Sequence, residues 1–190
     1  MNIAYTNGII LDGTEHMTPQ SGKAILTEGG VITDIVPDTA VPSDYEKIDL
    51  GGKYILPGLI NLHVHLAGSG KPKKKQSDPV KLVRLITSNA IMRHIGKKMV
   101  AGYAKTQLLS GVTTIRPVGG IADFDTFVRN KIHDGKLVGP RILASNMAVS
   151  VHGGHMAGSL AYEAATPEEA VAYVDKIAGD KPDIIKLMIT

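Results

Sequence analysis

Strand and helix patterns alternate along the chain after Pro57, and this alternation restricts the fold more than any other feature. Four apolar strand candidates, at residues 59–66, 112–117, 141–145 and 183–190, are separated by segments with helical periodicity. Strands that alternate with helices in this way are typical of a parallel sheet covered by helices. No G-x-G-x-x-G motif follows the first strand, which argues against a dinucleotide-binding sheet. A (β/α) barrel is therefore favoured.

A complete barrel of this kind needs eight strand–helix units and about 250 residues. The chain has 190 residues, and four strands alone would leave two open, apolar sheet edges. We therefore expect an α/β fold in which residues 57–190 form the first four units, the N-terminal half, of a (β/α)8 TIM-like barrel. We also expect a partner, the C-terminal half of the barrel, on the same precursor or on a second chain.

The helical segments have recognisable ends. Asp78-Pro79 is typical of a helix start, because aspartate caps the first turn and proline suits the first helical position. The helical pattern then continues to Ser110, with an interruption expected near Gly96. The segment Thr166-Pro167-Glu168-Glu169 matches a capping box and predicts a helix that ends at Ala178.

Residues 1–56 have a different pattern. Short strand candidates alternate there with turn signals such as Asn7-Gly8, Asp12-Gly13 and Gly29-Gly30, and no helical period is present. This pattern predicts a small β-sandwich subdomain or a partial barrel.

Charge and cysteine content limit the partners and the surroundings of the chain. Lys and Arg outnumber Asp and Glu by three (21 against 18), too small an excess to indicate nucleic acid. Part of this excess lies in the run Lys71–Lys75, which is typical of a solvated loop. The absence of cysteine excludes disulfides and thiolate metal sites. No apolar stretch reaches membrane-spanning length and no signal-peptide pattern is present, so we expect a cytoplasmic protein without a membrane partner.

Two histidines in the first predicted strand are candidates for metal ligands. Side chains at i and i+2 of a strand point to the same face, so His63 and His65 point one way, while Leu62, Val64 and Leu66 point the other. Two imidazoles on one face, backed by an apolar face, indicate half of a metal site. The alternative is a histidine pair on a solvated strand face.

Lys186 is unusual because it interrupts the apolar run of the fourth predicted strand. Strands of parallel sheets are buried on both faces, and a buried lysine is costly unless it is paired or neutralised. Reaction with carbon dioxide would convert the amine into a carbamate, an anionic ligand able to bridge two metal ions. The alternative is an ammonium that reaches solvent at the end of the strand.

Three segments together resemble one family. Leu56–His65 (LPGLINLHVH) is similar to the first-strand signature of the metal-dependent amidohydrolase superfamily. Gly111–Arg116 (GVTTIR) resembles the second strand of that superfamily, and Asp183–Met188 (DIIKLM) resembles the strand that bears its carboxylated lysine. Within the superfamily, the chain looks most like the N-terminal portion of the imidazolonepropionase-like and prolidase-like branch.

The resemblance implies a barrel joined to a β-sandwich built from both chain ends, so residues 1–56 would be an incomplete sandwich that expects C-terminal strands. It also implies two divalent metal ions, with zinc as the expected metal. His63 and His65 would bind the more buried ion, and carbamylated Lys186 would bridge both. The other ligands and the general-base Asp would come from later strands, so we expect no catalytic residue in this portion.

Two further histidines are candidates for substrate binding. His155 ends a Gly-Gly-His sequence in the loop after the third predicted strand, on the side where barrel active sites form. There it could contact substrate or stabilise an oxyanion, or it could simply bond to the backbone of its loop. His152, in the same loop, is a weaker candidate.

The expected function is hydrolysis of a C–N bond in a small-molecule amide or a dipeptide by metal-activated water, as in a dipeptidase or carboxypeptidase. We expect the complete unit to be a homo-oligomer. Two alternatives remain open: a catalytically inert half-barrel that serves as a structural partner, and a cyclic-amide hydrolase or deaminase on the same scaffold. Deaminases of this superfamily commonly use one metal without a bridging carbamate, so Lys186 argues against a deaminase.

Overall fold

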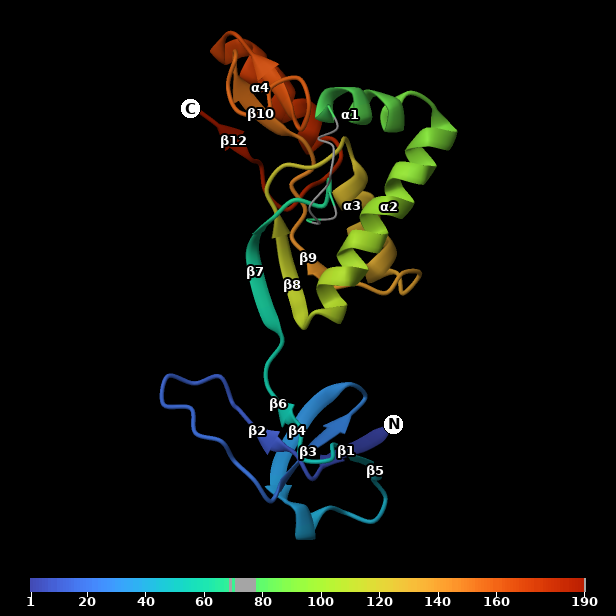
Figure 1. The fold of residues 1–190 in the computed structure, drawn as a ribbon, viewed down its shortest axis with the longest axis vertical. Coiled ribbons are helices and arrows are strands. Elements are labelled where there is room, and N and C mark those ends of the chain that lie inside the picture. The colour runs from blue at the N-terminus through green and yellow to red at the C-terminus, as the bar shows by residue number, and fades with distance from the viewer. Residues whose placement is uncertain (69, 71–77, 190) are drawn as a thin grey trace. The chain divides into compact units, whose positions relative to one another are not determined.

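A computed structural model describes residues 1–68, 70 and 78–189 of the chain (Figure 1). The chain divides into two compact units, Met1–Pro57 and Gly58–Thr190, and each unit is described separately. The Lys71–Lys75 run, predicted as a solvated loop, lies outside the described residues.

The first unit is built from short strands. Its main sheet has the order β4-β3-β1-β5, in which β1 pairs antiparallel with β3 and parallel with β5. A separate parallel pair joins β2 to β6. The strands are β1 (Asn2–Thr6), β2 (Ile9–Ile10), β3 (Lys23–Glu28), β4 (Val31–Pro37), β5 (Glu46–Asp49) and β6 (Tyr54–Ile55), and a short 3₁₀ helix covers Asp38–Ala40. The predicted strands of this region are present, and the predicted sandwich stays a prediction.

Every strand pair of the second unit is parallel. One sheet has the order β7-β8-β9 and another the order β11-β10-β12. The strands are β7 (Leu59–Val64), β8 (Val112–Pro117), β9 (Arg141–Ile142), β10 (Ala148–Val151), β11 (Ala161–Ala164) and β12 (Leu187–Met188). The predicted mixed α/β fold is therefore confirmed, and the half-barrel within it stays a prediction.

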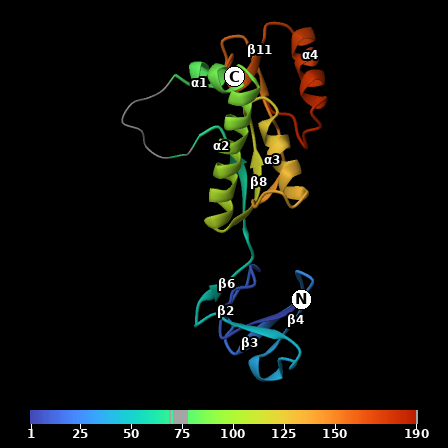
Figure 2. The same ribbon diagram turned by 90° about the vertical axis from the view of Figure 1, so that its right-hand side faces the viewer.

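Four helices accompany these strands in the described part of the unit. They are α1 (Pro79–Thr87), α2 (Ala90–Leu109), α3 (Phe124–His133) and α4 (Pro167–Ala178). Helices α2 and α3 lie side by side against β8 and β9 (Figure 2). Their contact forms the main core, in which Val100, Ile115 and Phe124 are almost completely buried. Within the described residues, no helix combines the length and apolarity that a membrane crossing requires.

The predicted helix ends are confirmed, whereas the predicted interruption at Gly96 is wrong. The helical segment breaks at Ser88 and Asn89, because the Asn89 side chain caps a new helix by accepting the Met92 N–H at 3.0 Å. Gly96 lies inside α2, where its missing side chain leaves room for the Phe124 ring.

The predicted strand lengths also need correction. The first strand ends at Val64, the third covers only β9, and the fourth is reduced to β12, while β10 and β11 are additional strands. Asp183 explains part of this difference, because its carboxylate accepts the Ala144 N–H at 2.8 Å. The carbonyl of Ala144 in turn accepts both the Asp183 and the Ile184 N–H. These contacts replace a regular ladder between the third and fourth strands.

Candidate active site

A cavity of about 340 Å³ lies at the carboxyl ends of the parallel strands β7, β8 and β12. Its polar lining comes from His63, His65, His155 and Lys186. Val118, Leu187, Met188 and Ile189 complete its wall. The structure therefore brings four of the five predicted site residues to one place, although they are up to 123 positions apart in the sequence (186 minus 63).

The strand pleat orients the two histidines of β7. Val64 and Leu66 are buried in the core, whereas His63 and His65 are exposed toward the cavity. The ring centroids of the two histidines are 5.3 Å apart, and the ring planes meet at 70°. The predicted apolar backing is incomplete, because Leu62 is about half exposed.

A main-chain hydrogen bond fixes the ring of His65. Its Nδ1 lies 3.0 Å from the carbonyl oxygen of Gly119, the residue two positions beyond the end of β8. A carbonyl only accepts, so Nδ1 must carry the proton, and Nε2 keeps a free lone pair. A neutral imidazole held in this way is suited to bind a metal ion through Nε2.

Lys186 immediately precedes β12 and is half buried. Its main-chain carbonyl accepts the Val149 N–H at 2.9 Å, which anchors this segment to β10. Among residues 1–68, 70 and 78–189, no carboxylate forms an ion pair with its ammonium. The predicted alternatives for the amine, modification or solvation, both agree with partial burial.

The two loop histidines have different surroundings. His155 is exposed and lines the cavity together with Lys186. His152 instead lines a neighbouring cavity of about 440 Å³, and its Nδ1 lies 2.9 Å from a carboxylate oxygen of Glu163. The same Glu163 oxygen accepts the Gly153 N–H at 2.8 Å, so His152 forms part of a surface loop contact.

The donor set suits part of a metal site. Within the described part of the chain, no three His, Cys, Asp or Glu side chains are grouped as metal ligands. Among the described residues, three imidazoles, those of His63, His65 and His155, and one amine line the cavity, and none of the lining residues carries a carboxylate. Zinc sites generally need three or four protein ligands. The residues therefore fit a metal ion that takes further ligands from elsewhere.

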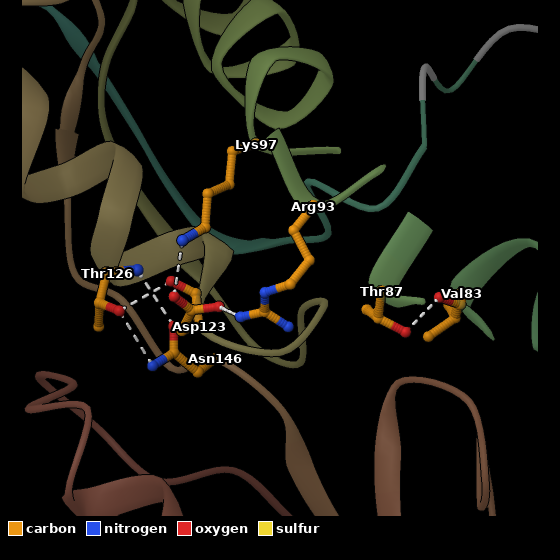
Figure 3. Close-up of polar contacts among 7 residues, drawn as sticks. All are labelled: Val83, Thr87, Arg93, Lys97, Asp123, Thr126 and Asn146. Carbon is orange, nitrogen blue, oxygen red and sulfur yellow. Dashed lines mark hydrogen bonds and ion pairs between the residues drawn. The ribbon is translucent and has the colours of Figure 1, made fainter. Parts of the chain in front are cut away.

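Polar residues hold the start of α3 beside the turn that follows β8 (Figure 3). Asp123, the N-cap residue of α3, binds Arg93 and accepts a hydrogen bond from Lys97 at 2.9 Å. The side chain of Asn146 accepts the Thr126 N–H at 3.0 Å and donates to the Thr126 hydroxyl at 3.2 Å. This network anchors the segment after β9 to α3.

Asp125 is a buried carboxyl group behind the same turn. It is 1% exposed, and neither of its oxygens has a hydrogen-bond partner among the described residues. Burial raises the pKa of Asp125 from its ordinary value to about 7. The carboxyl group packs against Gly120, where any Cβ would clash with it.

Sequence reasoning missed Gly119, Ser145 and Asn146, which support the site. The signal available for Gly119 is the Gly-Gly pair directly after the second predicted strand. No sequence signal identifies Ser145 and Asn146. Both accept hydrogen bonds from main-chain N–H groups, which nearly every residue carries.

The parallel strands, with a cavity at their carboxyl ends, define a mixed α/β protein. The sequence profile of the Amidohydrolase family matches residues 54–190. The chain therefore belongs to the amidohydrolase family, a family of hydrolytic enzymes, as its sequence motifs predict.

Curated relatives and solved structures agree with this assignment. A dihydroorotase of Trichlorobacter lovleyi is 31% identical over 134 residues, which cover 64% of this chain and 30% of that protein. An imidazolonepropionase of Salmonella schwarzengrund is 43% identical over 49 residues, 25% of this chain and 12% of the relative. A crystal structure of a Xaa-Pro dipeptidase with bound methionine is 27% identical, with a TM-score of 0.74 over 98% of this chain and 47% of that chain. The chain thus spans less than half the length of each of these proteins.

Proposed function

We propose that this chain supplies the N-terminal part of a metal-dependent hydrolase that cleaves the C–N bond of a dipeptide or a related small amide. The convergence of His63, His65, Lys186 and His155 on one cavity carries this proposal. Membership of the amidohydrolase family and the similarity to a Xaa-Pro dipeptidase support it. Bound divalent metal ions would activate water and polarise the substrate carbonyl.

Each residue of the cavity has a distinct part in this proposal. The free Nε2 of His65 and the ring of His63 would hold a metal ion, for which zinc is the first candidate. The exposed His155 would donate a hydrogen bond to substrate from the cavity wall. The catalytic base would be an Asp of the C-terminal portion.

Lys186 must lose its positive charge before two metal ions can bind beside it, because an ammonium repels divalent cations. Reaction with carbon dioxide would achieve this. The ammonium first releases one proton to solvent. The free amine nitrogen then forms a bond to the carbon of carbon dioxide and releases a second proton, which leaves an anionic carbamate. The carbamate would supply the negative charge that the described cavity lining lacks.

We further propose that the C-terminal half of the barrel is the necessary partner of this chain, and that the complete units form a homo-oligomer. The open edges of β7 and β12 support the first of these proposals, since each of these strands pairs on one side only within the described residues. The expected cytoplasmic location rests on the sequence and stays a prediction.

Metal analysis of the assembled protein with and without bicarbonate tests the proposed function. We expect about two zinc-like ions per unit, a ¹³C carbamate signal after labelling with ¹³C-bicarbonate, and hydrolysis of dipeptides. Lys186→Ala should lose the carbamate signal, most of the metal and at least about 100-fold in kcat/KM. Lys105→Ala, at an exposed position of α2, is the matched control and should retain all three.

An assembled protein that takes up no metal and hydrolyses no amide would contradict the proposed function. It would favour the inert structural partner instead. Full metal content and activity in Lys186→Ala would exclude the carbamate.

A further inference from the structure

The turn after β8 joins a candidate metal ligand to buried residues that follow β9. Gly119 has a φ of +113°, a conformation that a side chain would strain, and a Cβ there would lie 3.3 Å from Met188 Cε. Its carbonyl oxygen faces His65 Nδ1 at 3.0 Å. The direction of this carbonyl therefore decides where the His65 ring points.

Residues 145 and 146 fix this carbonyl through the two peptide groups of the turn. Ser145 Oγ accepts the Gly119 N–H at 2.8 Å, and the Asn146 carbonyl accepts the Gly120 N–H at 2.6 Å. A peptide group is planar and trans, so the Gly120 N–H and the Gly119 C=O point in opposite directions. The bond to Asn146 thus aims the Gly119 carbonyl toward His65.

Ser145 links these two bonds. Its hydroxyl donates to the Asn146 carbonyl at 3.2 Å while accepting from the Gly119 N–H. Ser145 is completely buried, so no solvent molecule can readily replace its hydroxyl. Because the Gly120 N–H donates to the Asn146 carbonyl, the peptide group between Gly119 and Gly120 is polarised, which strengthens the Gly119 carbonyl as an acceptor.

We propose that Ser145 is a positioning residue for His65. Through the Gly119–Gly120 turn, it holds the His65 ring with Nδ1 protonated and Nε2 free in the cavity. The purpose of this arrangement rests on the proposed function, because it is Nε2 that would bind the metal ion. The orientation of the ring itself is a property of this chain and can be measured without metal.

Nitrogen-15 NMR of histidine-labelled protein tests the proposal, at a pH where imidazoles are neutral and with His65→Gln used to assign the signal. We expect wild-type His65 in the Nδ1–H tautomer. In Ser145→Ala, a substantial Nε2–H population should appear, and affinity for Co²⁺ should fall about 10- to 100-fold. Ser145→Thr keeps the hydroxyl and should retain the wild-type tautomer.

Ser150→Ala is the matched control. Ser150 is also a buried serine, 1% exposed, but its hydroxyl has no hydrogen-bond partner among the described residues. This variant removes an equivalent group from a neighbouring segment and should leave the His65 tautomer and the Co²⁺ affinity unchanged.

The proposal is overturned by an Nε2–H tautomer in wild-type protein, or by a wild-type tautomer and Co²⁺ affinity in Ser145→Ala. If Ser145→Ala fails to fold, Ser145→Cys, whose thiol is a much weaker hydrogen-bonding group, takes its place, and a wild-type tautomer and Co²⁺ affinity in that variant overturn the proposal. A tautomer that depends on Ser145 in a protein that binds no Co²⁺ would support the positioning of the ring and contradict the proposed metal site.

Discussion

His65 shows how a single residue can combine a predictable and an unpredictable part. Its spacing from His63 predicts a shared face, and the structure confirms that both rings line one cavity. The hydrogen bond to Gly119 could not be predicted, because its acceptor is a main-chain atom brought close by the fold. The convergence of Lys186 with these rings likewise depends on strand order, which spacing does not encode.

Asp125 leads to a prediction about pH and stability. In the unfolded chain, its carboxyl group loses its proton above the ordinary pKa near 4, whereas the folded protein retains this proton up to a pKa of about 7. Between these values the unfolded state binds fewer protons, so the free energy of unfolding must fall as pH rises, by up to about 4 kcal/mol. Asp125→Asn should remove this pH dependence. The variant should therefore become more stable relative to wild type as the pH rises from 5 to 8.

Urea unfolding at several pH values measures the effect. Asp134→Asn is the control. Asp134 is exposed and pairs with Lys136, and this contact is the main reason why the pKa of Asp134 is lowered. This variant should retain the wild-type loss of stability between pH 5 and 8. A parallel pH dependence in wild type and Asp125→Asn would show that Asp125 is not the titrating group.

At the scale of elements, local signals predict the helix ends well. Asp78 accepts the Val80 N–H at 2.9 Å, and Thr166 caps α4 by accepting the Glu169 N–H at 3.3 Å. Gly96 gave a wrong prediction of a helix break, because glycine is generally unfavourable inside helices. Here glycine is required, since the ring of Phe124, which is distant in sequence, packs against this position. Tertiary packing therefore overrides propensity at this position.

Two glycines of α2 allow a matched test of this explanation. A Cβ at Gly96 would lie 2.5 Å from Phe124, whereas a Cβ at exposed Gly102 would meet no atom within 4 Å. Gly102→Ala should stabilise the protein by about 0.5–1 kcal/mol through helix propensity alone. Gly96→Ala should destabilise it by about 1–3 kcal/mol through overpacking. Thermal or urea unfolding gives both values, and a stabilising Gly96→Ala would contradict the packing explanation.

At the scale of the whole molecule, the sequence predicts the mixed α/β class, because strand and helix patterns alternate after Pro57. The lengths of the strands could not be predicted. The apolar residues of 183–190 favour one long strand. Hydrogen bonds between Asp183 and Ala144 instead shorten the strand that forms there.

The strand edges of the second unit give a prediction about association. Ile60 and Leu62 of β7 are 65% and 49% exposed, and Ile189, next to β12, is 78% exposed. If the C-terminal half of the barrel covers them, this chain alone should bind the dye ANS, and the fluorescence should fall when that half is added. Ile60→Ser should weaken the association about 10-fold or more.

Ile91→Ser is the control for this experiment, because Ile91 is 74% exposed on α2 rather than on a strand edge. It should leave the dissociation constant unchanged. Equal weakening by both variants would point to nonspecific apolar contact, and no association with the wild-type chain would exclude the proposed partner.

The oxygen atom that orients His65 belongs to the polypeptide backbone, which every amino acid possesses. Codon changes can therefore vary most side chains of that loop during evolution without deleting this acceptor. Two glycines of the loop are constrained instead. A left-handed backbone at Gly119 excludes most replacements, and a Cβ at Gly120 would clash with Asp125. Saturation mutagenesis should accordingly find both glycines intolerant, although neither contributes a side chain to the site.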